Sequence, residues 1–131
     1  MPLTYTIDSD RDVVFVRAEG KITDGDQISL ARKISSDPKY HPSIRFFSDY
    51  TQVTQNALSP AALRQTPTIF KFSPTSRRAT LVPARESESS VFLMYHAYCD
   101  IKNVSQPHVF RDRRKALDYL NEGVPPEKVI Q

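Results

Sequence analysis

Apolar and polar positions follow two periods along the chain, and their order predicts the fold. Residues 3–7 alternate apolar with polar side chains, which is typical of a strand with one buried face. The polar segment Asp8–Asp12 separates them from a second strand, Val13–Ala18, and Gly20 is expected to end this strand. Strands joined by so short a turn pair antiparallel, so the chain is predicted to begin with a β-hairpin.

Later segments alternate between strand and helix patterns. Three more strands are expected at Ile44–Asp49, Arg77–Val82 and His108–Phe110. Four helices are expected, with N-caps at Thr23, at Ser59, at Ser87 or Ser89, and at Asp112. Pro60 suits the first position of the second helix, whereas Pro67 is expected to kink that helix or restart it from Thr66.

This order of elements predicts a single α/β domain. Strand–helix–strand units that follow an antiparallel hairpin give parallel strands, so we expect one mixed five-stranded sheet covered by four helices. The segment Tyr50–Leu58 is expected to be the longest polar loop. The domain is expected to span residues 1–123, and residues 124–131 are expected to form an extended, partly disordered tail.

Composition narrows the class of protein further. At 131 residues, with 39% hydrophobic and 25% charged residues, the chain is expected to be one globular domain. It has no apolar run of the ~18 residues that a transmembrane helix needs and no signal-peptide pattern, and its single cysteine, Cys99, excludes an internal disulfide; we therefore expect a cytoplasmic protein. The net charge of +3 is mild, and acidic residues lie among the basic ones, so DNA binding is not expected.

Five segments of the chain resemble the sequence of a known family. They are residues 14–20 (Val-Phe-Val-Arg-Ala-Glu-Gly), 72–79 (Phe-Ser-Pro-Thr-Ser-Arg-Arg-Ala), 94–95 (Met-Tyr), 109–112 (Val-Phe-Arg-Asp) and 116–120 (Ala-Leu-Asp-Tyr-Leu). The family is the SpoIIAA-like group of small bacterial proteins, which is related in fold to STAS domains and to the lipid-carrying Sec14 group. The resemblance implies a STAS-like fold, and the family as a whole is largely without an assigned activity.

The resemblance also implies a place for a phosphorylation switch. Anti-sigma-factor antagonists of the STAS class bind a kinase-like partner, and their phosphorylated serine or threonine follows an aspartate at the start of the helix after the third strand. In this chain the third strand is expected to end at Asp49, and the usual Asp-Ser-x-Gly arrangement is missing. The hydroxyls near the equivalent place are Thr51, Thr54 and Ser59, which are the phosphorylation candidates.

A second candidate site is an anion site at the carboxyl ends of the strands. Arg85 and Arg111 are expected near helix N-termini, whose free amides favour a phosphate or a carboxylate. The alternative, which we favour, is that both arginines form ordinary surface ion pairs with neighbouring carboxylates. Arg77 and Arg78 are expected at the opposite edge, where a structural role is favoured over catalysis.

Motifs for catalysis and metal binding are missing. The chain has no nucleophile-elbow, phosphate-loop or dinucleotide-binding pattern, so an enzyme is not expected. His96 and Cys99 are spaced for one helix face, but no second cluster supplies further ligands, and neither a metal site nor a cofactor is expected. The aromatic residues Phe92, Tyr95 and Tyr98 are expected to be core or a subunit interface rather than a lipid pocket.

These observations favour a protein that acts by binding. We expect a regulatory protein-interaction module, homodimeric, in which the loop from Tyr50 to Ser59 faces a regulatory protein partner. Asp49 would orient this loop, Thr51 would lie in it, and Ser59 would cap the next helix and be the best phosphorylation candidate. The alternative is a carrier or sensor of a small anionic or lipid-like ligand held by Arg85 and Arg111. An apolar cavity larger than ~300 Å³ would favour that alternative.

Overall fold

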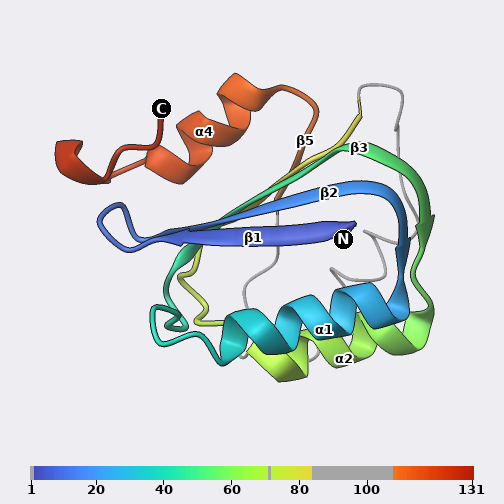
Figure 1. Cartoon of the computed structure of the whole chain (residues 1–131). Coiled ribbons are helices and arrows are strands. Elements are labelled where there is room, and N and C mark those ends of the chain that lie inside the picture. Colours follow the sequence, from blue (N-terminus) through green and yellow to red (C-terminus); the bar gives the residue numbers. More distant parts are fainter. Residues whose placement is uncertain (1, 71, 84–107) are drawn as a thin grey trace.

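A five-stranded sheet forms the centre of the protein. The computed structural model describes residues 2–70, 72–83 and 108–131. The strands lie in the order β1 (Leu3–Asp8), β2 (Val13–Thr23), β3 (Arg45–Ala57), β4 (Arg78–Leu81) and β5 (His108–Phe110). β1 pairs antiparallel with β2, and every later pair is parallel, so the predicted mixed sheet is confirmed (Figure 1).

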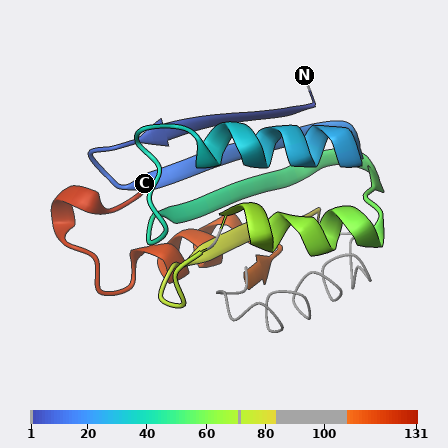
Figure 2. The same cartoon turned by 90° about the horizontal axis from the view of Figure 1, so that it is seen from below.

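Helices cover both faces of the sheet. α1 (Asp24–Ser35) and α2 (Pro60–Phe70) lie side by side on one face, and α4 (Arg113–Asn121) lies on the other (Figures 1 and 2). Three of the four expected helices therefore belong to the described part of the chain. The helix expected to start at Ser87 or Ser89 lies outside the described residues.

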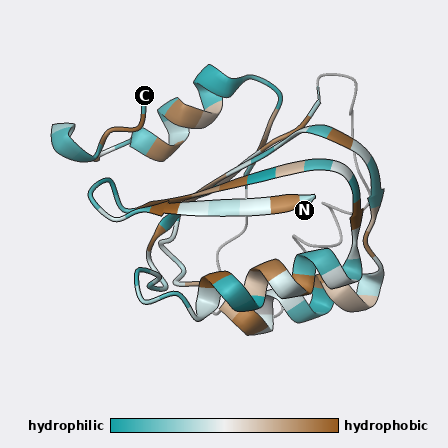
Figure 3. Cartoon of the chain, in the orientation of Figure 1, coloured by the Kyte–Doolittle hydropathy of each residue, from teal (hydrophilic) through white to brown (hydrophobic). Residues whose placement is uncertain are grey.

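The larger of two hydrophobic clusters lies under α1 and α2. It joins residues of β1, β2 and β3 to three residues of α1, namely Leu30, Ala31 and Ile34. Ile28 of the same helix is only half-buried. Each helix carries hydrophobic and hydrophilic residues on different sides, as Figure 3 shows, because one side packs on the sheet and the other faces solvent.

The second hydrophobic cluster joins the sheet to α4 and to the end of the chain. Ala116, Leu117 and Leu120 of α4 pack against strand residues, and Ile130 is buried among them with 4% of its surface exposed. A short 3-10 helix, η1 (Pro126–Lys128), turns the chain back toward the sheet. The expectation of an extended, partly disordered tail from residue 124 is therefore wrong, because burying Ile130 holds the tail against the molecule.

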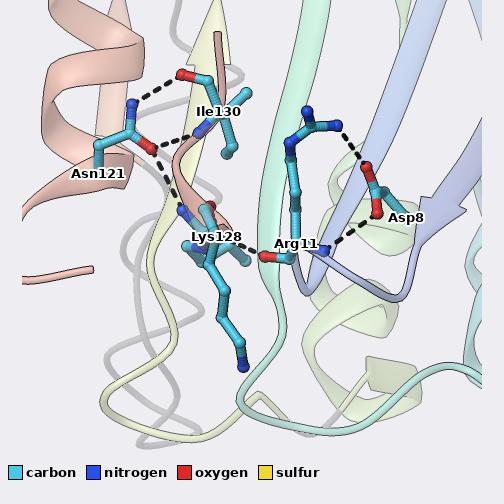
Figure 4. A network of polar contacts seen from close by, with 6 residues as sticks. Asp8, Arg11, Asn121, Lys128 and Ile130 are labelled. Atoms are coloured by element: carbon cyan, nitrogen blue, oxygen red, sulfur yellow. Dashed lines mark hydrogen bonds and ion pairs between the residues drawn. The ribbon is translucent and has the colours of Figure 1, made fainter. Parts of the chain in front are cut away.

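Buried Arg45 connects the start of β3 to this tail. Its guanidinium donates to the carbonyl oxygens of Leu120 (3.0 Å) and Lys128 (2.7 Å), and also to the carbonyl oxygen of Arg11. Asn121 adds a pair of bonds, since its side-chain amide donates to the Ile130 carbonyl and accepts from the Ile130 N–H, both at 2.8 Å (Figure 4). These contacts satisfy a buried charge with backbone oxygens from three separate segments.

Two strands are longer than predicted. β2 continues through Gly20 to Thr23, because Gly20 adopts a φ of 70° within the strand and the β2–β3 register shifts on either side of it. β3 continues to Ala57, so the polar segment Tyr50–Leu58 is mostly strand and not a loop. The strand was not predicted over this segment because its side chains are exposed or half-buried, so no apolar alternation marks it.

The helix α2 continues past Pro67 without a restart. Thr66 is buried and does not cap a second helix, since its hydroxyl donates to the carbonyl oxygen of Ala62 at 3.0 Å. The expected restart from Thr66 is therefore wrong. The apolar face of α2, which buries Leu63 and Phe70, holds the helix together across the proline.

Candidate functional site

The first turns of α1 and α2 share a connected cluster of polar groups. Thr23 caps α1 as predicted: its hydroxyl oxygen accepts from the N–H of Asp26, and the Asp26 carboxylate accepts from the N–H of Thr23 at 3.0 Å. This reciprocal capping box fixes where α1 begins. It thereby places Asp24, the first residue of the helix, toward the start of α2.

Asp24 joins the two helix starts. One carboxylate oxygen accepts the N–H of Ser59 at 2.7 Å, and the other accepts the Ser59 hydroxyl at 2.6 Å. The same hydroxyl oxygen accepts the N–H of Ala62 at 3.3 Å, which is the capping contact predicted for Ser59. The Ser59 hydroxyl therefore bridges a carboxylate of one helix and the backbone of another.

The surroundings keep Asp24 ionised. The hydrogen bonds from the Ser59 hydroxyl and then from the Ser59 N–H lower the pKa of the Asp24 carboxyl, and partial burial opposes them. Both helix N-termini also direct positive dipole ends toward this carboxylate. The site is thus an anion held at the meeting point of two helices, with a serine hydroxyl as its main ligand.

A small cavity lies between the sheet and the two helices. Its volume is about 90 Å³, and the apolar residues that line it include Leu30, Ile34, Phe46, Leu63, Phe70 and Phe72. This is well below the ~300 Å³ at which ligand pockets begin. The cavity observed here therefore does not meet the criterion set for a carrier of a lipid-like ligand.

Asp49 and Thr51 lie away from Ser59. Asp49 occupies the middle of β3, where one carboxylate oxygen accepts the N–H and the hydroxyl of Thr51 at 2.9 and 2.6 Å. Its other oxygen accepts from Arg113 of α4 at 3.0 Å. The expected loop that Asp49 would orient does not exist as a loop, and Asp49 instead connects β3 to the opposite helix layer.

The remaining expected site residues are scattered. Thr54 is exposed on β3, and Arg111 is exposed just after β5. Arg85 lies outside the described residues, so the anion site that would combine it with Arg111 stays a prediction. Cys99 and His96 also lie outside them, as do the aromatic residues of that segment.

The two arginines before and within β4 have the structural contacts that were predicted. Arg77 donates to the Tyr119 carbonyl oxygen at 2.8 Å and to the Glu122 carboxylate at 2.6 Å. Arg78 is buried, and its guanidinium lies 3.6 Å from the centre of the Phe72 ring. Such contacts hold α4 and the turn before β4 in place.

Within residues 2–70, 72–83 and 108–131, no group of three or more His, Cys, Asp or Glu side chains is arranged to hold a metal ion. In the same ranges, no helix is both long and apolar enough to span a membrane.

Comparison with known proteins identifies the fold. No protein-family model matches the chain, and no curated protein matches its sequence. Among solved structures, it is similar to an uncharacterised protein of the DUF3478 family from Shewanella loihica, which has a SpoIIAA-like fold; the two share 19% identity over 90% of this chain and 91% of that one, with a TM-score of 0.54. This chain has a SpoIIAA-like fold. At this level of identity the likeness concerns architecture, and the SpoIIAA-like fold leaves the function to be argued from the site.

Proposed function

We propose that this SpoIIAA-like protein is a regulatory protein-interaction module that acts by binding, with Ser59 as its phosphorylation switch. The observation that carries the proposal is the Asp24–Ser59 pair, in which one hydroxyl joins the starts of α1 and α2. Among the three candidate hydroxyls, that of Thr51 bonds to Asp49 two residues away, and Thr54 is exposed on β3. Ser59 alone of the three connects two helices.

A phosphate on Ser59 would exchange one anion for another at the start of α2. It would remove the hydroxyl proton that Asp24 accepts and place about two negative charges against the Asp24 carboxylate. The free N–H groups and the dipole of α2 would still favour the phosphate at this position. Phosphorylation would therefore expel Asp24 and separate the two helix starts, which changes the surface that a partner contacts.

The first experiment is native mass spectrometry of the protein isolated gently from its host, followed by mapping of phosphopeptides. A phosphate on Ser59, or a co-purifying protein that unphosphorylated chain binds and phosphorylated chain does not, would support the proposal. The matched variants are Ser59→Asp and Thr54→Asp, which add the same charge within one segment. We expect Ser59→Asp to shift the NMR resonances of the Asp24 and Gly25 amides and to weaken partner binding at least tenfold, whereas Thr54→Asp does neither.

The proposal fails if Ser59→Asp binds the partner as the wild type does. In that case Ser59 is only a helix cap, and Ser59→Ala should then cost about 1 kcal/mol of stability without other effect. The alternative, a carrier of a small anionic or lipid-like ligand, has less support because the apolar cavity under α1 and α2 is small, and the larger groove between β1 and α1 has the charged residues Asp26 and Lys33 in its lining. A stoichiometric small molecule in the native mass spectrum would favour it.

A further inference from the structure

The outer edge of β1 offers a row of backbone groups to a partner. β1 is the first strand of the sheet and forms its upper margin in Figure 2, where no other described element lies beyond it. The Pro2 carbonyl oxygen accepts the N–H of Glu19 at 2.9 Å. The backbone N–H and C=O groups of the even-numbered residues in this segment therefore point toward β2. The N–H and C=O groups of Leu3, Tyr5 and Ile7 therefore point away from the sheet.

The edge of β1 also lacks the features that usually prevent strand pairing. Edge strands are normally blunted by charges, proline or a bulge. From Leu3 to Ile7, β1 has none of these, its register with β2 is unbroken, and Figure 3 shows no strongly hydrophilic residue along this stretch. This edge is therefore suited to accept another strand.

A second β1 in antiparallel orientation complements this edge. If the two-fold axis passes through Tyr5, each Leu3 pairs with the partner's Ile7, and about six N–H···O bonds form between the strands. Leu3, Tyr5 and Ile7 contribute to the cluster under α1, so the apolar sides of the two strands fall on the same face. On the other face, each exposed Thr4 lies opposite the partner's Thr6.

The helix α1 fits the same symmetry. A groove of about 420 Å³ separates β1 from α1, and Asp26, Ser29 and Lys33 line its helix side. The two-fold axis reverses the partner's α1, so Asp26 at one end meets the partner's Lys33 at the other. Because α1 lies over β1 and β2, and strands are ~4.8 Å apart, the two helices would lie ~10 Å apart, which is a normal packing distance.

We propose that a second copy of this chain pairs through β1, so that one sheet runs through both protomers and the two α1 helices pack together. This interface does not include Ser59, although it shares α1 with the phosphorylation switch. The mass by light scattering and sedimentation, measured across a concentration series, should be that of a dimer.

Charge variants test the pairing through β1. The double variant Thr4→Lys/Thr6→Lys places like charges opposite each other and should be monomeric, as should Thr4→Glu/Thr6→Glu. Mixing the two should restore a one-to-one dimer, because each lysine then lies opposite a glutamate of the partner. On α1, Lys33→Glu should weaken the dimer about tenfold because Glu would face the partner's Asp26, whereas the adjacent control Arg32→Glu, which lies outside the groove lining, should not.

Amide exchange provides a readout that does not depend on any variant. The amides of Leu3, Tyr5 and Ile7 should be protected at high concentration and exchange faster on dilution, while those of Thr4 and Thr6 stay protected at both. A wild-type protein that is monomeric at all concentrations overturns the proposal. So does a dimer that neither the lysine pair nor Lys33→Glu weakens, since its interface must then lie elsewhere.

Discussion

Asp24 makes more hydrogen bonds than its place in the sequence suggests. An aspartate in the first turn of a helix is favourable for the helix dipole alone, but here both carboxylate oxygens accept from Ser59. The pKa of the carboxyl is lowered as a result, first by the Ser59 hydroxyl and then by its N–H. The native state therefore holds the Asp24 proton less tightly than the unfolded state does.

This pKa shift predicts how stability depends on pH. Since the native pKa of Asp24 lies below its unfolded value of about 4, the unfolded state binds more protons in the acid range, and stability falls as pH drops through the native pKa. The pKa values of Asp8 and Asp37 are lowered too, so they add to the same trend. In urea unfolding from pH 6 to pH 2, Asp24→Asn should show a shallower acid loss than the wild type.

A conservative substitution in β3 is the control for this experiment. Thr54→Ala leaves the carboxylate in place and should keep the wild-type slope against pH. If Asp24→Asn loses stability in acid as steeply as the wild type, the Asp24–Ser59 bonds do not favour the ionised carboxyl in solution.

At the residue scale, local contacts could be predicted from sequence and distant ones could not. The caps Thr23, Ser59 and Asp112 bond to backbone N–H groups within three residues. Their residue type and position are therefore sufficient to predict them as caps. Asp24 bonds to Ser59 across 35 residues, and no local pattern encodes that separation. The role of Arg45 was missed for the same reason, because its carbonyl partners come from both ends of the chain.

At the scale of elements, the paired strands β2 and β3 continue beyond the residues whose apolar pattern predicted them. Both begin with buried residues; β3 ends with exposed or half-buried ones, and β2 after Ala18 keeps only Ile22 buried, yet the strands stay paired to Thr23 and Ala57. Periodicity detected only their buried halves, since it reports burial of one face rather than backbone pairing. Within the described residues, the order of strands and helices was still predicted correctly, because each buried half was sufficient to identify its element.

Gly20 marks the irregular part of this pairing and is open to a direct test. Its φ of 70° is a conformation that side chains with a Cβ rarely adopt. Gly20→Val should therefore destabilise the protein by about 1–2 kcal/mol, and Gly20→Asn by less, because asparagine tolerates left-handed backbone. Urea unfolding of both variants makes the comparison.

The two substitutions separate backbone conformation from strand preference. Valine is a better strand former than asparagine, so strand propensity alone predicts the opposite order. A Gly20→Val protein that equals or exceeds Gly20→Asn in stability would mean that the left-handed conformation is not what selects glycine.

At the scale of the whole molecule, the last residues complete the second core. Ile130 packs beside α4, and Asn121 and Arg45 bond to the backbone of the tail. A chain ended after Gly123 loses these contacts and leaves Arg45 without the Lys128 carbonyl. It should be less stable by about 3 kcal/mol, the sum expected for a lost buried isoleucine and a broken buried hydrogen bond.

The matched control for this truncation removes only the exposed residue Gln131, which should leave the urea midpoint unchanged. Equal midpoints for the chain ended at Gly123 and the full chain would contradict the prediction. Gly123, Pro125 and Pro126 correctly indicate that α4 ends before them. They do not indicate that the tail packs against the sheet. Docking depends on Ile130 meeting a surface that exists only after the sheet has formed.

The Arg45 contacts also bear on how the protein is made. Two of its carbonyl partners, those of Leu120 and Lys128, lie 75 and 83 residues after Arg45 and are therefore translated later. Until both residues have left the ribosome, the guanidinium lacks them and the surface beneath Ile130 is uncovered. The nascent chain can therefore close its second core only after residues 120–130 have emerged, and a chaperone would find a binding site there until then.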